Sequence, residues 1–344
     1  MKRWLMVLFP LTLILTLFSA GCGNREGGQA AGGAVIAVFI PGVIAGSPIY
    51  EMLAGGAEKA VQDYAASRPG NVPSLLIVEG GFNQAEWENQ ITTMAASGSF
   101  DLIVSSNPSL PDIVRPVSSN FPNQRFLLFD AEYAGNPNVY TLYYNQREKA
   151  FMAGHIAALV SQEMSPGAKR IGFVAGQEFP VMNNVILPGF TEGARAVDPD
   201  FTVDFRVVGN WFDAARAGEL AAAMIRGGAN VLLPNAGGAN HGVVQAASEA
   251  GAKVVWFDSN GYAVRPGVVV GSSVLRQDKA AYEKIKLYLE GNLPFGKAEI
   301  AGVADGFVDF IEDDPHYITS VSQAVRDRQA VLTSRFRSGE LRLD

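Results

Sequence analysis

Two aspartates stand where an apolar, strand-like run of residues ends. Asp130 occurs in Phe-Asp-Ala-Glu, and Asp258 occurs in Trp-Phe-Asp-Ser-Asn. A short carboxylate at such a position can accept two hydrogen bonds from hydroxyl groups, which suits a sugar or a polyol. Aspartate also caps helix N-termini. Ligand binding is favoured for Asp258, whereas the two interpretations are nearly balanced for Asp130.

Aromatic residues occupy the same set of predicted loops. They are Tyr50, Phe179, Trp211, Phe212 and Tyr262. Aromatic faces stack on flat heterocycles, although aromatic side chains also fill protein cores. Trp211, between Asn210 and Asp213, is the favoured ligand contact. The amides that could bind the edge of such a ring are Asn107, Asn183, Asn184, Asn210 and Asn235.

Catalytic signatures are absent from the sequence. It contains no G-x-S-x-G nucleophile elbow, and neither glycine-rich stretch matches a Walker A loop or G-x-G-x-x-G. The stretch 237–242 follows a predicted strand and opens a helix, so its amides could bind an anionic or carbonyl group or serve close packing. A nucleoside hydrolase needs clustered aspartates near its N-terminus, and residues 34–60 contain none. The sequence therefore predicts a binding protein rather than an enzyme.

The elements that must position these residues alternate between strand and helix. Apolar runs of strand length recur at 34–40, 75–78, 102–104, 126–129 and 139–143, with helical patterns at 49–66, 85–96 and 110–121. A long helix at 148–163 begins a second series, with strands at 170–174, 202–207, 231–233, 254–257 and 268–274 and helices at 182–196, 214–226, 240–250 and 277–289. A last apolar piece at 306–311 ends the predicted core. Doubly buried strands that each precede a helix predict an α/β fold of two parallel sheets, which bind ligands beyond the carboxyl ends of their strands.

The N-terminus has the pattern of a bacterial lipoprotein signal. Lys2 and Arg3 precede an apolar run at 4–18, and small residues then lead to Cys22, the only cysteine. That run is shorter than the ~20 residues that span a bilayer. We expect a lipid on Cys22, removal of residues 1–21 and a flexible tether at 22–33, which would hold the protein on a bacterial membrane, facing the periplasm or the outside.

Composition limits the partners further. Without Lys2 and Arg3 the chain has 25 basic and 34 acidic residues, a net charge of −9, which argues against binding to nucleic acid. A lipidated Cys22 leaves no thiol for disulfides or metal sites. The three histidines are scattered, at positions 155, 241 and 316, which argues against a histidine metal centre. We therefore expect neither a metal nor a resident cofactor.

Several stretches resemble one family of bacterial lipoproteins. They are 129–131 (FDA), 145–154 (NQREKAFMAG), IGFVAGQE, 189–200 (GFTEGARAVDPD), 236–238 and 257–258. From residue 34 to 309 the chain resembles the basic membrane protein family, whose best-known members are purine nucleoside receptors. The resemblance implies a type I periplasmic-binding-protein fold, with two Rossmann-like lobes, three hinge crossings and delivery of ligand to an ABC transporter. It also implies that Asp258 binds sugar hydroxyls and that Arg276 serves the same end.

Two loops depart from the nucleoside receptors. Residues 47–50 (SPIY) replace a Ser-Phe-Asn-Gln stretch, and 105–111 (SSNPSLP) lack a glycine-serine pattern. In length and pattern the chain is similar to the riboflavin-binding lipoproteins of ABC uptake systems in this family. We therefore expect riboflavin as the transported ligand, with a purine nucleoside or a ligand-sensing role as alternatives.

The predicted organisation follows from these points. The first lobe comprises 34–142 and 262–300, and the second comprises 143–261 and 301–344. The lobes are expected to close on the ligand, and the closed form to dock on an ABC permease that works with an ATPase. The predicted ligand-binding residues are Tyr50, Asn107, Asp130, Phe179, Asn183, Trp211, Asn235, Asp258 and Arg276.

Overall fold

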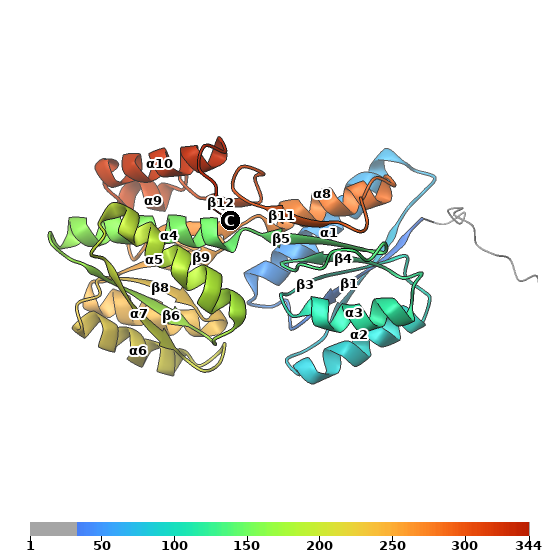
Figure 1. Ribbon diagram of the computed structural model, residues 1–344, viewed down its shortest axis with the longest axis horizontal. Coiled ribbons are helices and arrows are strands. Elements are labelled where there is room, and N and C mark those ends of the chain that lie inside the picture. Colours follow the sequence, from blue (N-terminus) through green and yellow to red (C-terminus); the bar gives the residue numbers. More distant parts are fainter. Residues whose placement is uncertain (1–32, 344) are drawn as a thin grey trace, which may run out of the picture.

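The computed structural model describes residues 33–343. The predicted signal peptide, the lipidation site Cys22 and the tether up to residue 32 lie outside these residues. Within 33–343, none of the helices has the length and hydropathy needed to cross a bilayer. Two separate sheets, each flanked by helices, make up two lobes (Figure 1). The predicted α/β fold of two parallel-sheet lobes is confirmed.

The first lobe is built on a six-stranded sheet in the order β11-β5-β4-β3-β1-β2, and all of its neighbours run parallel. Its strands are β1 (Val35–Ile40), β2 (Ser74–Glu79), β3 (Leu102–Ser106), β4 (Arg125–Phe129), β5 (Val139–Tyr144) and β11 (Ala298–Ala301). Its helices are α1 (Pro48–Ser67), α2 (Trp87–Ala96), α3 (Leu110–Asn120) and α8 (Gln277–Leu289). All five residues of β3 are buried, which explains the continuous apolar run in the sequence.

The second lobe repeats this order as β12-β10-β9-β8-β6-β7, with β12 antiparallel to β10. Its strands are β6 (Arg170–Ala175), β7 (Thr202–Val207), β8 (Val231–Asn235), β9 (Lys253–Asp258), β10 (Val269–Leu275) and β12 (Val308–Phe310). Its helices are α4 (Gln146–Met164), α5 (Leu187–Val197), α6 (Ala214–Arg226), α7 (Asn240–Ala250), α9 (Pro315–Ser320) and α10 (Gln323–Arg337). Each strand therefore has a counterpart in the first sheet, so that β2 matches β7, β1 matches β6 and β4 matches β9.

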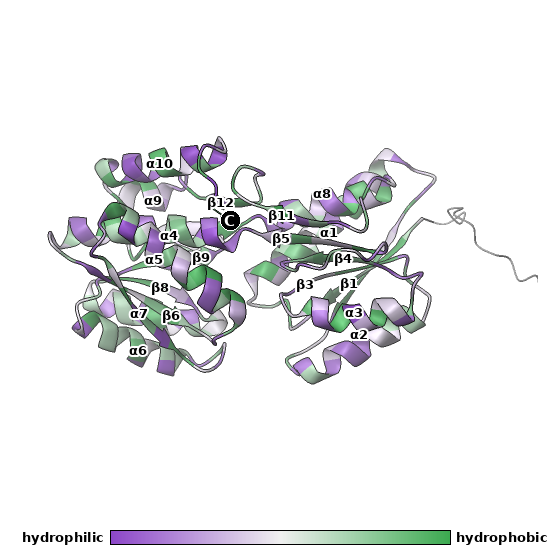
Figure 2. Cartoon of the chain, viewed as in Figure 1, coloured by the Kyte–Doolittle hydropathy of each residue, from purple (hydrophilic) through white to green (hydrophobic). Residues whose placement is uncertain are grey.

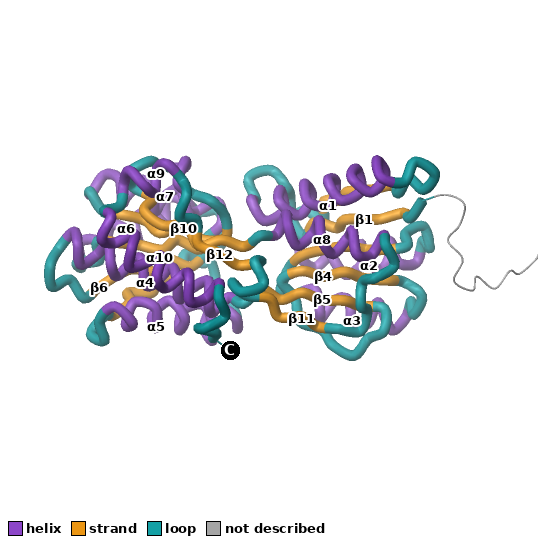
Figure 3. The backbone as a smooth tube through the Cα atoms, turned by 90° about the horizontal axis from the view of Figure 1, so that it is seen from above, coloured by secondary structure: helices purple, strands orange, loops and turns teal. Residues whose placement is uncertain are grey.

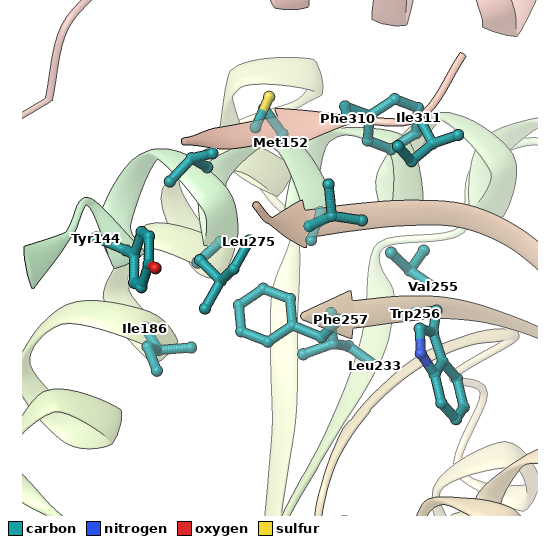
Figure 4. Close-up of a cluster of buried hydrophobic side chains, with 14 of the residues drawn as sticks. Tyr144, Met152, Ile186, Leu233, Val255, Trp256, Phe257, Leu275, Phe310 and Ile311 are labelled. Atoms are coloured by element: carbon teal, nitrogen blue, oxygen red, sulfur yellow. The ribbon is translucent and has the colours of Figure 1, made fainter. Parts of the chain in front are cut away.

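Helix α4 is the central helix of the second lobe. Asn145 caps it by accepting a hydrogen bond from the amide of Glu148, and 14 of its 19 residues are buried. A Cβ at Gly154 would lie 1.9 Å from the carbonyl oxygen of Phe190, so glycine is what lets α5 approach this closely. The other side of α4 faces the apolar cluster of Figure 4, in which Met152, Leu275 and Phe257 lie close together.

The chain passes between the lobes three times. The crossings connect β5 to α4, β10 to α8, and β11 to β12, and Figure 3 shows them in the centre of the molecule. The predicted division at residue 262 is wrong, because β10 pairs with β9 and places residues 262–275 in the second lobe. Alternating strands and helices reveal the presence of a strand, but not the sheet in which it pairs.

The C-terminal part extends beyond the predicted end of the core. Strand β11 and helices α9 and α10 were not predicted. Helix α10 packs on α4 through Phe336, whose ring centroid lies 5.8 Å from that of Phe151 in an edge-to-face arrangement. Figure 2 shows hydrophilic and hydrophobic segments alternating along α10, as expected of a helix that covers a core on one side.

Candidate functional site

Asp130 and Asp258 occupy equivalent places in the two lobes. Asp130 directly follows β4, and Asp258 is the last residue of its counterpart β9. Within 33–343 they are the two non-glycine residues with positive φ, at 50° and 75°. Aspartate tolerates this conformation better than most residues, and such strain concentrates at functional sites. Each sheet therefore presents one carboxylate in the same unusual backbone conformation at its carboxyl edge.

The first turn of α4 contacts both carboxylates. The side-chain amide of Gln146 donates to Oδ1 of Asp130 over 2.9 Å, and the ammonium of Lys149 pairs with Oδ1 of Asp258. Burial raises the pKa of Asp130, the charge of Lys149 and the hydrogen bond from Gln146 oppose that rise, and the charge of Asp258 adds to it. The two aspartates and Lys149 are therefore close enough to interact electrostatically across the first crossing.

Lys149 is a buried cation with two partners. Its side chain is 1% exposed, and its Nζ lies 3.9 Å from the centroid of the Phe257 ring. Burying an ammonium is costly unless it is paired, and Asp258 supplies the countercharge. The side chain of Asp258 is 31% exposed, so it remains accessible while Lys149 holds one of its oxygens.

In each lobe an aromatic ring also packs against a glycine, and the two glycines follow counterpart strands. Gly42 and Gly176 follow β1 and β6, and each accepts a 2.9 Å hydrogen bond from a glycine amide in the loop after the neighbouring edge strand. A Cβ at Gly42 would lie 3.0 Å from Cε2 of Tyr50, and one at Gly176 would lie 2.5 Å from Cε3 of Trp211. Glycine at both positions therefore makes room for a ring against the end of the sheet.

Hydrogen bonds hold both rings in place. The Tyr50 hydroxyl donates to the carbonyl of Pro41 over 3.0 Å and accepts from the Asn107 amide over 3.4 Å. Burial raises the pKa of Tyr50 to about 12, so the hydroxyl is neutral at physiological pH. The indole Nε1 of Trp211 donates to Oε1 of Gln177 over 3.0 Å, and the Phe179 ring lies 6.2 Å from Trp211, tilted by 48°.

Two further predicted residues join the aromatic group of the second lobe through their backbones. The amide of Asn183 donates to the carbonyl of Phe179 over 3.0 Å, and the carbonyl of Asn235 accepts from the amide of Gly176 over 2.8 Å. Asn183 is exposed and donates to Glu178, and Asn235 is half-buried at the end of β8. Arg276 lies at the second crossing, with Nη2 3.6 Å from Oδ2 of Asp309. The structure therefore groups Tyr50 with Asn107, Phe179 with Trp211, and Asp130 with Asp258.

Two of the aromatic candidates differ sharply in exposure. Tyr262 is fully buried, and its hydroxyl donates to the carbonyl of Ile311 over 2.8 Å, so it belongs to the core. Phe212 is 78% exposed.

Gln146 and Lys149 were missed as site residues, although both lie in the stretch 145–154. The signal for Lys149 was a charged residue within the apolar stripe of the predicted helix. Further polar atoms are buried without a hydrogen-bond partner in the described part of the chain: Oε1 of Gln146, Oγ of Ser106 and Nε2 of Gln277. Ser106 ends β3 beside Phe129, one residue before Asp130. Such atoms are where the hydroxyls of a ligand could form hydrogen bonds.

A cavity of about 400 Å³ lies beside the first and third crossings, within the size range of small-molecule sites. Its lining includes Tyr143, Gln146, Glu148, Asn184, Asp305 and Arg342. Burial raises the pKa of Glu148, whose carboxylate accepts from the amides of Val303 and Leu343. Gln146 thus faces this cavity and also contacts Asp130. Residues 33–343 contain no cluster of three or more side chains suited to binding a metal ion.

Two parallel α/β lobes, three crossings and matched polar and aromatic groups at the strand ends define a two-lobed solute-binding fold. A solute-binding protein of an ABC transporter system from Aeropyrum pernix K1 has the same fold, with a TM-score of 0.74, 21% identity and coverage of 90% of this chain and 93% of that one. Another from Conexibacter woesei has a TM-score of 0.66 at 19% identity, covering 90% and 98%. The chain belongs to the Bmp family, described as ABC transporter substrate-binding protein PnrA-like, which matches residues 34–340.

Curated relatives support the family assignment. The ABC transporter nucleoside-binding protein BmpA of Lactococcus lactis is 31% identical over 135 residues, 39% of this chain and 37% of that protein. The CD4+ T-cell-stimulating antigen of Listeria monocytogenes is 26% identical over 161 residues, 47% of this chain and 43% of the antigen. These two alignments span less than half of each relative. Basic membrane protein B of Borrelia garinii is 23% identical over 310 residues, 88% of this chain and 87% of that protein.

Proposed function

We propose that the protein is the substrate-binding component of an ABC importer and that it captures riboflavin between its lobes, without catalysing a reaction. One observation carries this proposal. Each lobe holds an aromatic ring, Tyr50 or Trp211, on the glycine that follows its first strand. The flavin ring would stack between these two aromatic surfaces, and the ribityl hydroxyls would reach Asp258 and the buried acceptors around Asp130.

Closure of the lobes favours ligands that contact both aromatic rings. A ligand stabilises the closed state only through contacts that the open state does not make. Stacking on an aromatic ring contributes ~1–3 kcal/mol per base-sized ring. A flat ring that touches both Tyr50 and Trp211 makes its second stack only when the lobes come together. Asp258, held by Lys149 at the first crossing, supplies the polar contacts of the second lobe.

A purine nucleoside is the alternative ligand, and the Lactococcus relative favours it because its name describes nucleoside binding. A purine also presents a flat face, and its ribose presents hydroxyls to a carboxylate. The two rings and two aspartates suit both ligands. We prefer riboflavin because its larger ring system spans both aromatic surfaces and its longer polyol reaches both carboxylates.

The transport role implies an anchor and partners. We propose that Cys22 carries a lipid that holds the protein on the outer side of the cytoplasmic membrane. The closed form would dock there on a permease driven by an ATPase. A sensory receptor could recognise the same closed form, and a neighbouring permease gene would favour transport.

A spectroscopic titration tests the ligand. Residues 23–344 would be purified, and the riboflavin fluorescence followed as protein is added, with adenosine and guanosine as competitors. We expect the native chain to quench the fluorescence and Trp211→Ala to quench it only at higher protein concentrations. Binding of a nucleoside without any riboflavin quenching would replace riboflavin by the nucleoside, and binding of neither would reject both.

A further inference from the structure

Two phenylalanines are the most exposed large apolar side chains in the described part of the protein. Phe82 is 82% exposed and Phe212 is 78% exposed. Each is in the loop that follows the edge strand of its own sheet, β2 or β7. Leaving one such ring in water loses the free energy of burying it, so the exposure of two in counterpart loops needs an explanation.

The two loops start in the same way. The amide of Gly80 bonds to the carbonyl of Ile40 over 2.7 Å, and the amide of Val208 bonds to that of Ala175 over 2.8 Å, at the ends of the counterpart strands β1 and β6. In each loop a glycine with positive φ follows, at 68° for Gly81 and 97° for Gly209. The loops therefore leave the two sheets at equivalent points, and each has a positive-φ glycine as its second residue.

These two loops lie at the edge of each sheet opposite the crossings between the lobes. Strands β2 and β7 are the edge strands at one side of the two sheets, whereas the chain crosses between lobes from β5, β10 and β11 at the other side. In Figure 1 the crossings lie in the upper part, and the helices α2 and α6, which follow the two loops, lie in the lower part. Rotation about the crossings moves the edges farthest from them through the longest path.

We propose that the rings of Phe82 and Phe212 come into contact when the lobes close. This contact would lie at the mouth of the site, between the two lobes. The contact buries both rings only in the closed state, so it lowers the free energy of that state independently of the ligand. This proposal rests on the closure in the proposed function but not on the identity of the ligand. Since each ring gains most of its burial on closure, Phe82→Ala or Phe212→Ala should weaken ligand binding about tenfold.

Disulfide trapping tests the contact directly, because Cys22 is the only native cysteine. The full chain would be purified in detergent with Cys22→Ser and the pair Phe82→Cys and Phe212→Cys. A control chain would carry Phe82→Cys with Val331→Cys, because Val331 is 64% exposed on α10 at the other side of the second lobe. A disulfide needs Cα atoms about 4.4–6.8 Å apart, so trapping reports a true approach of the loops.

We expect an oxidant to form an intrachain disulfide in the Phe82–Phe212 pair at least tenfold faster than in the control pair, and riboflavin to increase that rate. Equal rates for the two pairs, or disulfides only between chains, would overturn the contact, and the second result would indicate a dimer surface. If riboflavin changes no rate but the pair still traps selectively, the contact stands and the choice of riboflavin fails. Thermal melts of both reduced variants verify that they are folded.

Discussion

Replacement of Lys149 by methionine tests the buried link between the first crossing and the ligand site. Methionine preserves most of the apolar stem but removes the ammonium that pairs with Asp258. Removing one partner of a fully buried pair costs ~3–5 kcal/mol, since the other charge is left unpaired. Asp258 is 31% exposed and regains some hydration, so we expect Lys149→Met to lower the free energy of unfolding by about 2 kcal/mol at pH 7.

The pH dependence of this loss has a defined sign. The charge of Lys149 opposes the burial that raises the pKa of Asp130, so the variant should raise that pKa further. A carboxyl whose folded pKa exceeds its unfolded value favours folding most when protonated, and that advantage disappears as the pH rises through the folded pKa. The deficit of Lys149→Met should therefore be largest at pH 7 and shrink toward pH 4.

Urea unfolding followed by circular dichroism, at pH 7 and at pH 4.5, measures both quantities. Lys169→Met is the matched control, because it removes a lysine whose side chain is 37% exposed from its pair with Asp198 and should cost under ~1 kcal/mol. Adding Asp258→Asn to Lys149→Met should restore part of the stability, since the carboxylate that loses its cation is then replaced by a neutral amide. A loss no larger than that of the control, or one independent of pH, would refute the reasoning.

Three further predictions concern the ring support, the stacking and a buried histidine. Gly176→Ala should displace the Trp211 ring and weaken ligand binding at least tenfold in the fluorescence titration, whereas Gly55→Ala, on an open helix surface, should leave it unchanged. Trp211→Ala should weaken binding by ~1–3 kcal/mol, and an unchanged affinity would assign the ring to structure alone. Burial lowers the pKa of His155, whose ring hydrogen-bonds to Gln329. The contribution of neutral His155 to the free energy of unfolding should therefore be fully present above pH 6.5 and decrease as the pH falls below it. His155→Gln should flatten this pH dependence in urea titrations.

Much of the fold could be predicted because its signals are local. The parallel strands are buried on both faces, so each appears as a short apolar run that any window of the sequence reveals. Helix α4 was predicted within two residues at each end, since buried residues recur along its length. Strand β11 has only one buried residue among four and gave no such signal. Helix α10 lies beyond the last apolar run, and its burial depends on contact with α4.

The candidate site also combines features that the sequence predicts with features that depend on tertiary contacts. The sequence by itself determined that Asp130 and Asp258 stand at strand ends and that aromatic residues share their loops, because these are relations between neighbours in the chain. Only the tertiary structure decided that Lys149 pairs with Asp258, 109 residues away, and that the Trp211 ring packs against Gly176. The same holds for the placement of β10 in the second sheet. Local propensity specifies which element forms, whereas partners distant in the chain are selected by how the elements pack together.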